Sequence, residues 1–350
     1  MGADTAIEWT HQPGFRGATW NPTIGCRRVS PGCEHCYAEV MSRRIVAMGG
    51  PAAKRYVQTV KHDAAGAPRA AWSGRFVEVR EVLDLPLRTK APTCYFVNSM
   101  SDLFGEGVSD EYIAAVFGVM AATPRHRYQI LTKRAERMAR WFEWIASFEN
   151  EHGPPPAEVA LIEAENRCVE VDRVARPWPL PNVWLGVSVE DQQRADERIP
   201  HLLRCPAAVR FLSVEPLLGP VTLDPCVLGC KGHLAETFGN PLVNWVIVGG
   251  ESGPGARPCA LEWIESVVAQ CREAGVPVFV KQLGSFVVSE DRTAPDDVMA
   301  MFKSWQPEHA DRAPSGESWA WRAGLRDRKG GDPSEWPDSL RVREFPKVPR

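Results

Sequence analysis

The sequence predicts an α/β protein built on a parallel sheet, as a partial or full (β/α) barrel. Short runs of Val, Ile, Leu and aromatic residues recur along the chain and end in polar or Gly-containing residues, which is typical of buried parallel strands followed by functional loops. Helix-like segments lie between most of these runs, with roughly 25 to 35 residues per unit, as in βαβ units. At 350 residues the chain is long enough for one barrel or for two ordinary domains.

Seven segments are predicted as strands from their apolar runs. They are 18–25, 93–100, 127–133, 182–190, 209–215, 244–251 and 276–282.

Three segments have apolar residues at three- and four-residue spacing and are predicted as helices: 109–123, 133–148 and 260–275. The first begins at Ser109, a favourable N-cap, and the last ends at Gly275, a favourable C-cap.

The remaining chain sets the domain organisation that we expect. Residues 1–300 form the barrel, and an irregular extension rich in charge, Pro and Trp packs on it. In the first of three expected insertions, alternating apolar residues at 76–84 indicate a small strand or hairpin. The extension is 301–350, and the insertions lie near 52–92, 149–180 and 222–242.

Composition excludes some classes of protein. Hydrophobic residues make up 44% and charged residues 24%, and no apolar run approaches a membrane span, so we expect no membrane association. The first residues lack the basic and apolar stretches of a secretory signal, which favours the cytoplasm. A net charge of −3 argues against coating of nucleic acid, although a local basic groove stays compatible with it.

Three of the ten cysteines, Cys26, Cys33 and Cys36, lie within eleven residues on the loop after the first predicted strand. In a reducing compartment we expect thiols, not disulfides. A structural zinc site needs four ligands, whereas a [4Fe–4S] cluster with three thiolates leaves one iron open to an external ligand. Three cysteines therefore favour a reactive cluster, and a zinc site completed by His35 or another Cys is the alternative.

This loop resembles that of the radical S-adenosylmethionine (SAM) enzymes, whose three cysteines follow the first strand of a partial barrel. Their usual spacing is C-x3-C-x2-C, and the first gap here is six residues long. The chain is more closely similar to a radical-SAM-like family often described only as phage proteins, which is in turn distantly similar to spore photoproduct lyase. The segments that carry this similarity are NPTIGCRRVSPGCEHCYAE, FVNSMSDLF, YQILTKR, VWLGVSVEDQ, FLSVEPLLGP, VIVGGESGPGARP, FVKQLG and KGGDPSEWP.

The resemblance implies that Cys26, Cys33 and Cys36 hold three irons and that SAM chelates the fourth. One electron would then cleave SAM to methionine and a 5′-deoxyadenosyl radical, inside a barrel that excludes water. His35, or alternatively Tyr37, would lie along the adenine.

Polar residues at predicted strand ends are candidates for binding SAM. The amide, hydroxyl and carboxylate after the second strand suit an ammonium group, and glycines let a backbone approach a ligand. A lysine suits a carboxylate or phosphate. The candidates are Asn98, Ser99, Asp102, Lys133, Glu190, Gly249 and Gly250.

Glu215, Glu251 and Lys281 are the predicted catalytic residues, because the carboxyl ends of parallel strands form the active face of a barrel. Helix capping, or pairing between lysines and glutamates, is the structural alternative. Cys226, Cys230 and His233 permit a second metal site if a fourth ligand exists, with unpaired thiols as the alternative.

The leading hypothesis is a [4Fe–4S]-dependent radical SAM enzyme acting on a nucleic-acid-derived substrate, such as a modified base or a lesion, with an electron-donor protein as partner. The resemblance, not the composition, indicates that substrate. The alternative is a zinc-stabilised nucleic-acid-binding or interaction protein without radical chemistry. A third hypothesis is a degenerate enzyme that keeps the cluster for structure or redox sensing.

Overall fold

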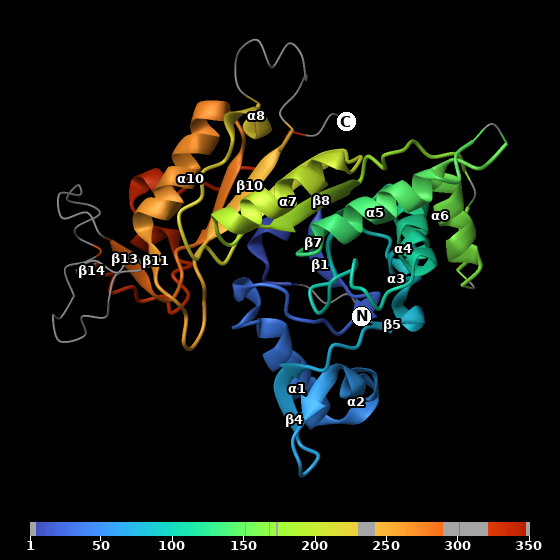
Figure 1. Ribbon diagram of the computed structural model, residues 1–350, viewed down its shortest axis with the longest axis horizontal. Helices are drawn as coiled ribbons and strands as arrows, with labels where there is room; N and C mark the ends of the chain where they lie inside the picture. Colours follow the sequence, from blue (N-terminus) through green and yellow to red (C-terminus); the bar gives the residue numbers. More distant parts are fainter. Residues whose placement is uncertain are drawn as a thin grey trace. The chain divides into compact units, whose positions relative to one another are not determined.

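The computed structural model describes residues 5–150, 152–167, 169–172, 174–229, 242–289, 301 and 321–347 (Figure 1). The chain divides into two compact units. The first comprises Met1–Val187 with Pro200–Val209, and the second comprises Ser188–Ile199 with Arg210–Arg350. Helix α7 (Gln192–Arg204) contributes residues to both units.

Four parallel strands form the sheet of the first unit, in the order β1-β6-β7-β8. All five residues of β6, TCYFV, are buried, which explains why the strand reads as an uninterrupted apolar run. The strands are β1 (Arg16–Trp20), β6 (Thr93–Val97), β7 (Arg127–Thr132) and β8 (Val183–Ser188).

Helix α4 (Asp110–Ala122) is central to the first unit, because every residue from Tyr112 to Ala121 is buried. Ser109 caps it as predicted, since its side chain accepts a hydrogen bond from the Tyr112 N–H. Helix α6 packs against α4 and lies within the interval 149–180. The other helices here are α3 (Leu85–Arg88), α5 (Ala135–Ala146), α6 (Pro156–Glu165) and the 3-10 turns η1 (Glu8–Thr10) and η4 (Arg80–Val82).

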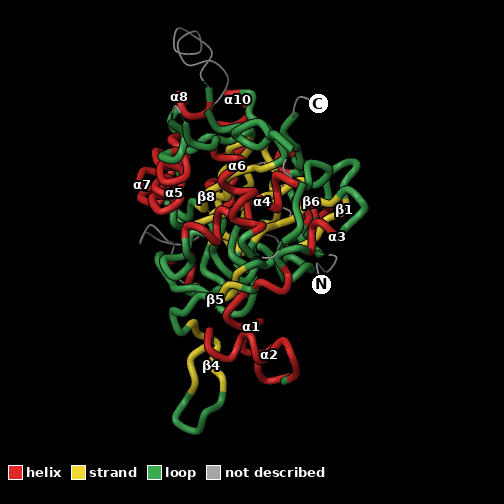
Figure 2. The backbone as a smooth tube through the Cα atoms, turned by 90° about the vertical axis from the view of Figure 1, so that its right-hand side faces the viewer, coloured by secondary structure: helices red, strands yellow, loops and turns green. Residues whose placement is uncertain are grey.

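A loop and an arm follow β1. The short strands β2 (Thr23–Ile24) and β5 (Val77–Glu78) pair antiparallel, and β3 (Val60–His62) and β4 (Pro68–Trp72) form a hairpin. The small strand expected at 76–84 therefore exists as β5, and the hairpin at 60–72 is an additional element that was not predicted. The arm also contains α1 (Tyr37–Met48), α2 (Gly50–Tyr56) and η3 (Val57–Thr59), while η2 (Pro31–Cys33) belongs to the loop (Figure 2).

The second unit has three parallel strands in the order β9-β10-β12 and a small sheet in the order β11-β13-β14. Helix α10 (Leu261–Ala274) ends, as predicted, at a left-handed Gly275 with φ of 71°. The strands are β9 (Val209–Val214), β10 (Trp245–Gly249), β11 (Cys259–Ala260), β12 (Val278–Gln282), β13 (Val287–Ser289) and β14 (Trp321–Arg322). Helix α8 (Pro225–Leu228) and the turns η6 (Pro333–Glu335) and η7 (Asp338–Leu340) complete the unit.

The C-terminal segment lies along β12. The Val280 N–H donates to the Val342 carbonyl at 2.8 Å, and the Glu344 N–H donates to the Val278 carbonyl at 3.0 Å. Trp336 is buried and donates its indole N–H to the Gly330 carbonyl. This part of the extension is thus held to the second unit by backbone pairing and an aromatic anchor.

The seven predicted strands and three predicted helices are confirmed, with ends that shift by a few residues. Both units have parallel strands in chain order with helices between them, so the parallel α/β class is confirmed. In the described part of the chain, none of the helices has the length and apolar character needed to cross a bilayer.

Candidate functional site

The three clustered cysteines lie on the loop that joins β2 to α1. Cys33 ends the turn η2, where its N–H donates to the Ser30 carbonyl at 3.0 Å, and Cys36 is the residue before helix α1. All three are reduced and half-buried. The sulfurs of Cys26 and Cys36 pack against an apolar cluster that includes Tyr56 and Trp72. The loop therefore carries three half-buried thiols, but among the described residues Cys26, Cys33 and Cys36 are not placed around one common metal position.

The electrostatics of the loop distinguish its thiols. Burial raises the pKa of Cys26 to about 12, although the nearby Arg134 guanidinium opposes this rise. Burial also raises the pKa of Cys36, while the N–H groups of Glu39 and Ala38 at the start of α1 act in the opposite direction. The raised pKa values keep Cys26 and Cys36 protonated without metal, so a bound metal must displace protons from these two thiols.

Arg134 reaches this loop from the end of β7. One terminal nitrogen, Nη1, lies 2.9 Å from Asp102 Oδ2 and 3.7 Å from Cys26 Sγ, and Nη2 donates to the Arg27 carbonyl at 2.8 Å. The side chain is only 5% exposed. Our sequence reasoning missed Arg134 and selected its neighbour Lys133, although a cation after a strand was the right kind of signal.

Asp102 is the partner that holds Arg134 in place. Its Oδ1 accepts from the Thr132 hydroxyl at 2.7 Å, and its Oδ2 also accepts from the Lys133 N–H at 3.1 Å. Because the carboxylate is buried and surrounded by protein donors, it positions the end of β7. The structure thus gives Asp102 an observed positioning role, while a contact with SAM stays a prediction.

Asn98 and Ser99 follow β6, as predicted. Asn98 is buried with φ of 61°, and its Nδ2 donates to the Thr23 hydroxyl at 2.8 Å. The Ser99 hydroxyl donates to Asn21 Oδ1 at 3.2 Å, and its carbonyl accepts from the Tyr37 hydroxyl at 2.6 Å. These contacts fix the end of β6 against β2 and the start of α1.

His35 and Tyr37 flank Cys36 and are both exposed. The Tyr37 side chain is 58% exposed even though its hydroxyl is hydrogen-bonded, so a ring face is accessible beside the cysteine loop. Lys133 is half-buried near the same network, through its backbone N–H.

The second unit contains the three predicted strand-end glutamates, each paired with a cation. Glu190 is fully buried, and its Oε2 lies 2.7 Å from Arg198 Nη1. Glu251 is buried and binds Arg257 through both carboxylate oxygens, at 2.6 and 3.0 Å. The Glu190–Arg198 pair has the burial of a structural ion pair, whereas the Arg257 side chain is 25% exposed.

Glu215 and Lys281 make the more accessible pair. Their charged atoms lie 3.2 Å apart, and the lysine side chain is 27% exposed. The structure therefore brings two of the three predicted catalytic residues together, whereas the third, Glu251, is engaged by Arg257.

Gly249 and Gly250 lie where backbones approach closely. A Cβ on Gly249 would stand 2.8 Å from Glu215 Oε1, and one on Gly250 would stand 2.1 Å from the Leu283 carbonyl oxygen. A Cβ on Gly249 would also stand 2.7 Å from the Gln282 carbonyl oxygen, so backbone packing requires a glycine at both positions.

The second cysteine group is only partly described. Cys226 is exposed and lies in α8, whereas Cys230 and His233 lie outside the described residues. In the described ranges, no three His, Cys, Asp or Glu side chains are placed to hold a metal ion.

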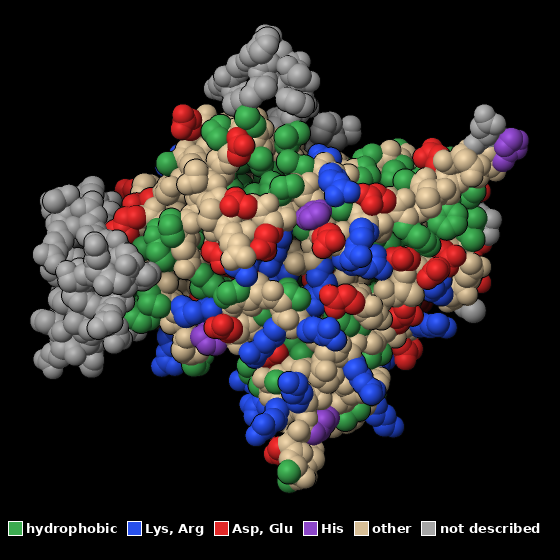
Figure 3. All heavy atoms as spheres, viewed as in Figure 1, with side chains coloured by type: hydrophobic (Ala, Val, Ile, Leu, Met, Phe, Trp, Pro, Cys, Tyr) green, Lys and Arg blue, Asp and Glu red, His purple; other side chains and the backbone are tan. Residues whose placement is uncertain are grey.

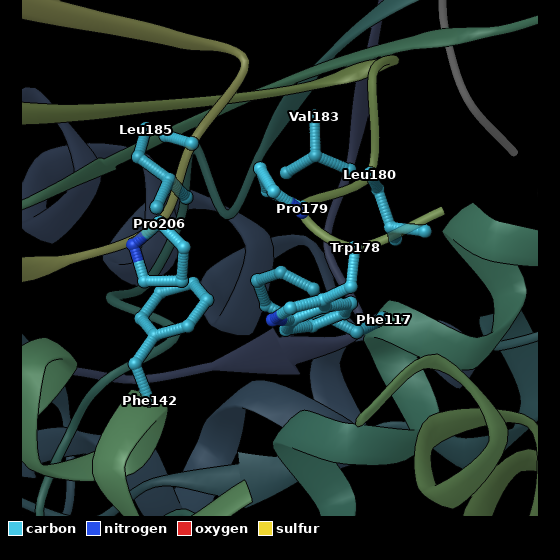
Figure 4. A pocket seen from close by; sticks show the side chains of 9 residues that line it. Phe117, Phe142, Trp178, Pro179, Leu180, Val183, Leu185 and Pro206 are labelled. Atoms are coloured by element: carbon cyan, nitrogen blue, oxygen red, sulfur yellow. The ribbon is translucent and has the colours of Figure 1, made fainter. Parts of the chain in front are cut away.

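A small apolar pocket lies in the first unit, between α4, α5 and the segment before β8 (Figure 4). Its volume is about 10 Å³, which is room for roughly one water molecule. The lining has no ionisable side chain, and the rings of Phe117, Phe142 and Trp178 dominate it. It is a packing defect and not a substrate site.

The chemistry of the loop fits an iron–sulfur cluster. Three soft thiol ligands lie on one loop, and the Arg134 guanidinium and the N–H groups at the start of α1 oppose the cost of thiolate charge at Cys26 and Cys36. A four-iron cluster takes each cysteine on a different iron, so its ligands need not surround a single point.

Comparison with known proteins gives one family. A family model described as "Protein of unknown function (DUF5131)" matches residues 4–322, so the chain belongs to this family. No curated protein and no solved structure matches the chain.

Proposed function

We propose that this member of the DUF5131 family is a [4Fe–4S]-dependent radical SAM enzyme. Cys26, Cys33 and Cys36 would each bind one iron and leave the fourth iron for SAM. The observation that supports the proposal is the loop itself, which carries three half-buried thiols and where Arg134 lies 3.7 Å from the Cys26 sulfur. When bound, the cluster and SAM would supply a 5′-deoxyadenosyl radical that abstracts hydrogen from the substrate.

The fold that we propose is a partial (β/α) barrel of the radical-SAM type. Two observations support it: parallel strands follow chain order within both units, and the cysteine loop comes after the first of them. Reduced thiols throughout the described chain are consistent with a cytoplasmic location.

The residues of the first unit divide into two roles. Asp102 and Asn98 hold the strand ends and the cysteine loop in place through the hydrogen bonds described above. Tyr37 and His35 offer exposed rings beside Cys36 for the adenine of SAM, and Ser99 and Lys133 are polar groups for its charged end. Gly249, Gly250 and Glu190, which belong to the second unit, stay predicted SAM-binding residues.

Glu215 and Lys281 are the proposed substrate groups of the second unit. Their pair is partly exposed, so it can exchange its mutual contact for a polar substrate, and Glu251 supports the neighbouring strand end through Arg257. The proposed substrate is nucleic-acid-derived, either a modified base or a lesion, and a separate electron-donor protein supplies the reducing electron.

Anaerobic reconstitution tests this function. The wild-type protein should bind about four irons with sulfide per chain and release 5′-deoxyadenosine from SAM after reduction. Cys26→Ala, Cys33→Ala and Cys36→Ala should each lower the iron content, whereas Cys226→Ala, outside the loop, should not.

Three results would contradict the proposal. Undiminished iron in all three loop variants would exclude the cysteines as ligands. One tightly bound zinc per chain, with no sulfide, would favour a zinc-stabilised binding protein instead. Intact iron with no effect of SAM on the EPR spectrum would indicate a cluster kept for structure or redox sensing.

A further inference from the structure

A small arm, residues Tyr37–Trp72, grows directly out of the cysteine loop, because α1 begins at the residue after Cys36. It consists of α1, α2, η3 and the hairpin of β3 and β4. Figure 1 and Figure 2 show α1, α2 and β4 together at the end of a projection from the first unit.

The arm is basic although the chain is acidic. It contains six basic residues (Lys or Arg) but only two acidic residues (Asp or Glu), in a chain with a net charge of −3. Five of the six cations are exposed, and Arg55 is half-buried. Figure 3 shows Lys and Arg side chains gathered over this projection. No ion pair links the exposed five to any described residue: Arg43, Arg44, Lys54, Lys61 and Arg69.

The two carboxylates of the arm are occupied by partners within the arm and the adjoining cysteine loop. Glu39 is buried, where it pairs with Arg28 of the cysteine loop and accepts the Trp72 N–H at 3.1 Å. Asp63 accepts the N–H groups of Ala65 and Ala67 in the hairpin turn. The cations on the outer surface are therefore not neutralised by either carboxylate.

A folded scaffold holds these cations in place. Tyr56 and Trp72 are buried in one apolar cluster with Ala38 of α1, and the Cys36 side chain packs against the same cluster. The basic side chains are thus anchored to the cysteine loop, so that binding needs little ordering of the backbone.

The chemistry of the surface points to phosphates. Four of the six cations are arginines, whose planar guanidinium groups bind phosphate oxygens in pairs. Proteins that bind single strands stack bases on exposed aromatic rings. Tyr37, at the base of the arm beside Cys36, is the one exposed Phe, Tyr or Trp residue of the arm; the other two, Tyr56 and Trp72, are both buried, so no exposed ring of these types lies among the outer cations. The arm therefore fits the regular phosphates of a duplex better than unstacked bases.

We propose that the arm binds the phosphate backbone of a nucleic-acid duplex and holds the duplex beside the cysteine loop. The inference deepens the proposed function and rests on it for the chemistry that would follow binding. The binding itself depends only on the arm.

The test measures the affinity of the full chain for a short fluorescein-labelled DNA duplex at several salt concentrations. Fluorescence anisotropy of the labelled duplex reports the binding. The arm variant is R43Q, R44Q, K61Q and R69Q combined. The matched control removes four exposed cations outside the arm, K90Q, R140Q, R328Q and K329Q combined, and so has the same net charge. Circular dichroism confirms that both variants are folded.

We expect the wild-type affinity to fall as salt rises, by about 0.9 in log affinity per phosphate contact for each tenfold change in salt. The arm variant should bind at least tenfold more weakly at low salt, and its slope should shrink by about three to four. The control should keep most of the affinity and the slope. If the fourfold variant does not fold, the single variants Arg44→Gln and Arg69→Gln should each reduce the slope by about one.

Three results would overturn the inference: equal losses in the arm variant and the control, preference for a single strand over the duplex, or no binding of the duplex by the wild-type chain. A chain with Cys26, Cys33 and Cys36 all changed to Ala separates the two proposals. If that chain binds the duplex normally while wild type takes up no iron, duplex binding by the arm is supported and the radical SAM proposal is contradicted. If wild type takes up iron but binds no duplex, the cluster proposal is supported and duplex binding by the arm is contradicted.

Discussion

At the scale of single residues, Arg134 links the ends of β6 and β7 to the cysteine loop. Its backbone has left the extended conformation, with φ of −114° and ψ of 57°, and its side chain turns toward Cys26. Two adjacent cations, Lys133 and Arg134, follow the strand, and their sequence cannot reveal which one turns inward. That choice depends on the backbone after the strand, which is why the strand end was predictable and the residue was not.

The burial of the Arg134–Asp102 pair leads to a stability prediction. Arg134→Met leaves the Asp102 charge buried without its cation, which should cost about 3 to 5 kcal/mol of unfolding free energy in guanidinium denaturation. Arg137→Met is the control, because Arg137 and its partner Asp110 are more exposed and should contribute less than about 1 kcal/mol.

A double variant separates the pair from its surroundings. Arg134→Met combined with Asp102→Leu should be less destabilising than the two single changes added together, because no unpaired charge then remains. Strict additivity would show that the two side chains stabilise the fold independently.

The strand-end glutamates lead to a second residue-level prediction. Arg198→Met should destabilise the chain by about 3 to 5 kcal/mol, because Glu190 is fully buried, whereas Lys281→Met should cost less than about 1 kcal/mol. Thermal or denaturant unfolding of the two variants gives the comparison. If Lys281→Met proves as costly as Arg198→Met, the Glu215–Lys281 pair is structural and not a substrate site.

At the scale of elements, the predicted strands were recognisable because each is a compact apolar run, such as TCYFV in β6. The small strand β5 was predicted from the alternation at 76–84, whereas the hairpin at 60–72 was not predicted because β4, PRAAW, has only one buried residue and carries no clear alternation. Helix α6 was not predicted because three prolines precede or begin it and its interval resembles a linker. Packing against α4, and not the hydrophobic pattern of α6 itself, explains why α6 forms a helix in this interval.

His126 joins α3, β6 and β7 and leads to a pH prediction. It is buried, its Nδ1 accepts the Thr93 N–H at 3.1 Å, and its Nε2 lies 2.9 Å from the Pro86 carbonyl. Burial lowers its pKa below the usual 6.5, and the adjacent Arg125 lowers it further.

Below pH 6.5 the unfolded chain therefore binds a proton that folded His126 does not. The unfolding free energy should fall as pH drops from about 6.5 toward the folded pKa, by up to about 1.4 kcal/mol per pH unit from this group. Urea denaturation across this range should show a smaller slope for His126→Gln than for wild type, while the exposed His62→Gln should keep the wild-type slope. An NMR titration that placed His126 at or above its ordinary pKa would contradict this account.

At the scale of the whole molecule, the net charge of −3 concealed a basic arm, because sums over a chain do not show where charges lie. A local basic surface was compatible with this net charge. Its location became visible only when the fold buried Glu39 and left Arg43 and Arg44 exposed.

Cluster loading should change the stability of the whole chain. Ligands that bind only the folded state stabilise it, and three thiols held on one folded loop would bind a cluster much more tightly than an unfolded chain. We expect anaerobic reconstitution to raise the melting temperature by several degrees and a chelator to reverse the rise. The chain with all three loop cysteines changed to Ala should show no such shift. A shift of equal size in that variant would place the metal elsewhere.

The segment at 342–344 that lies along β12 has a consequence for self-association. A strand at the edge of a sheet offers unpaired N–H and C=O groups on which another chain can add a strand. Here Val342 and Glu344 occupy backbone groups of Val280 and Val278, so the chain blocks that edge with its own tail. A chain cut before this segment would retain the cysteine loop and the arm, yet it would offer a template for fibre-like stacking of one copy on the next.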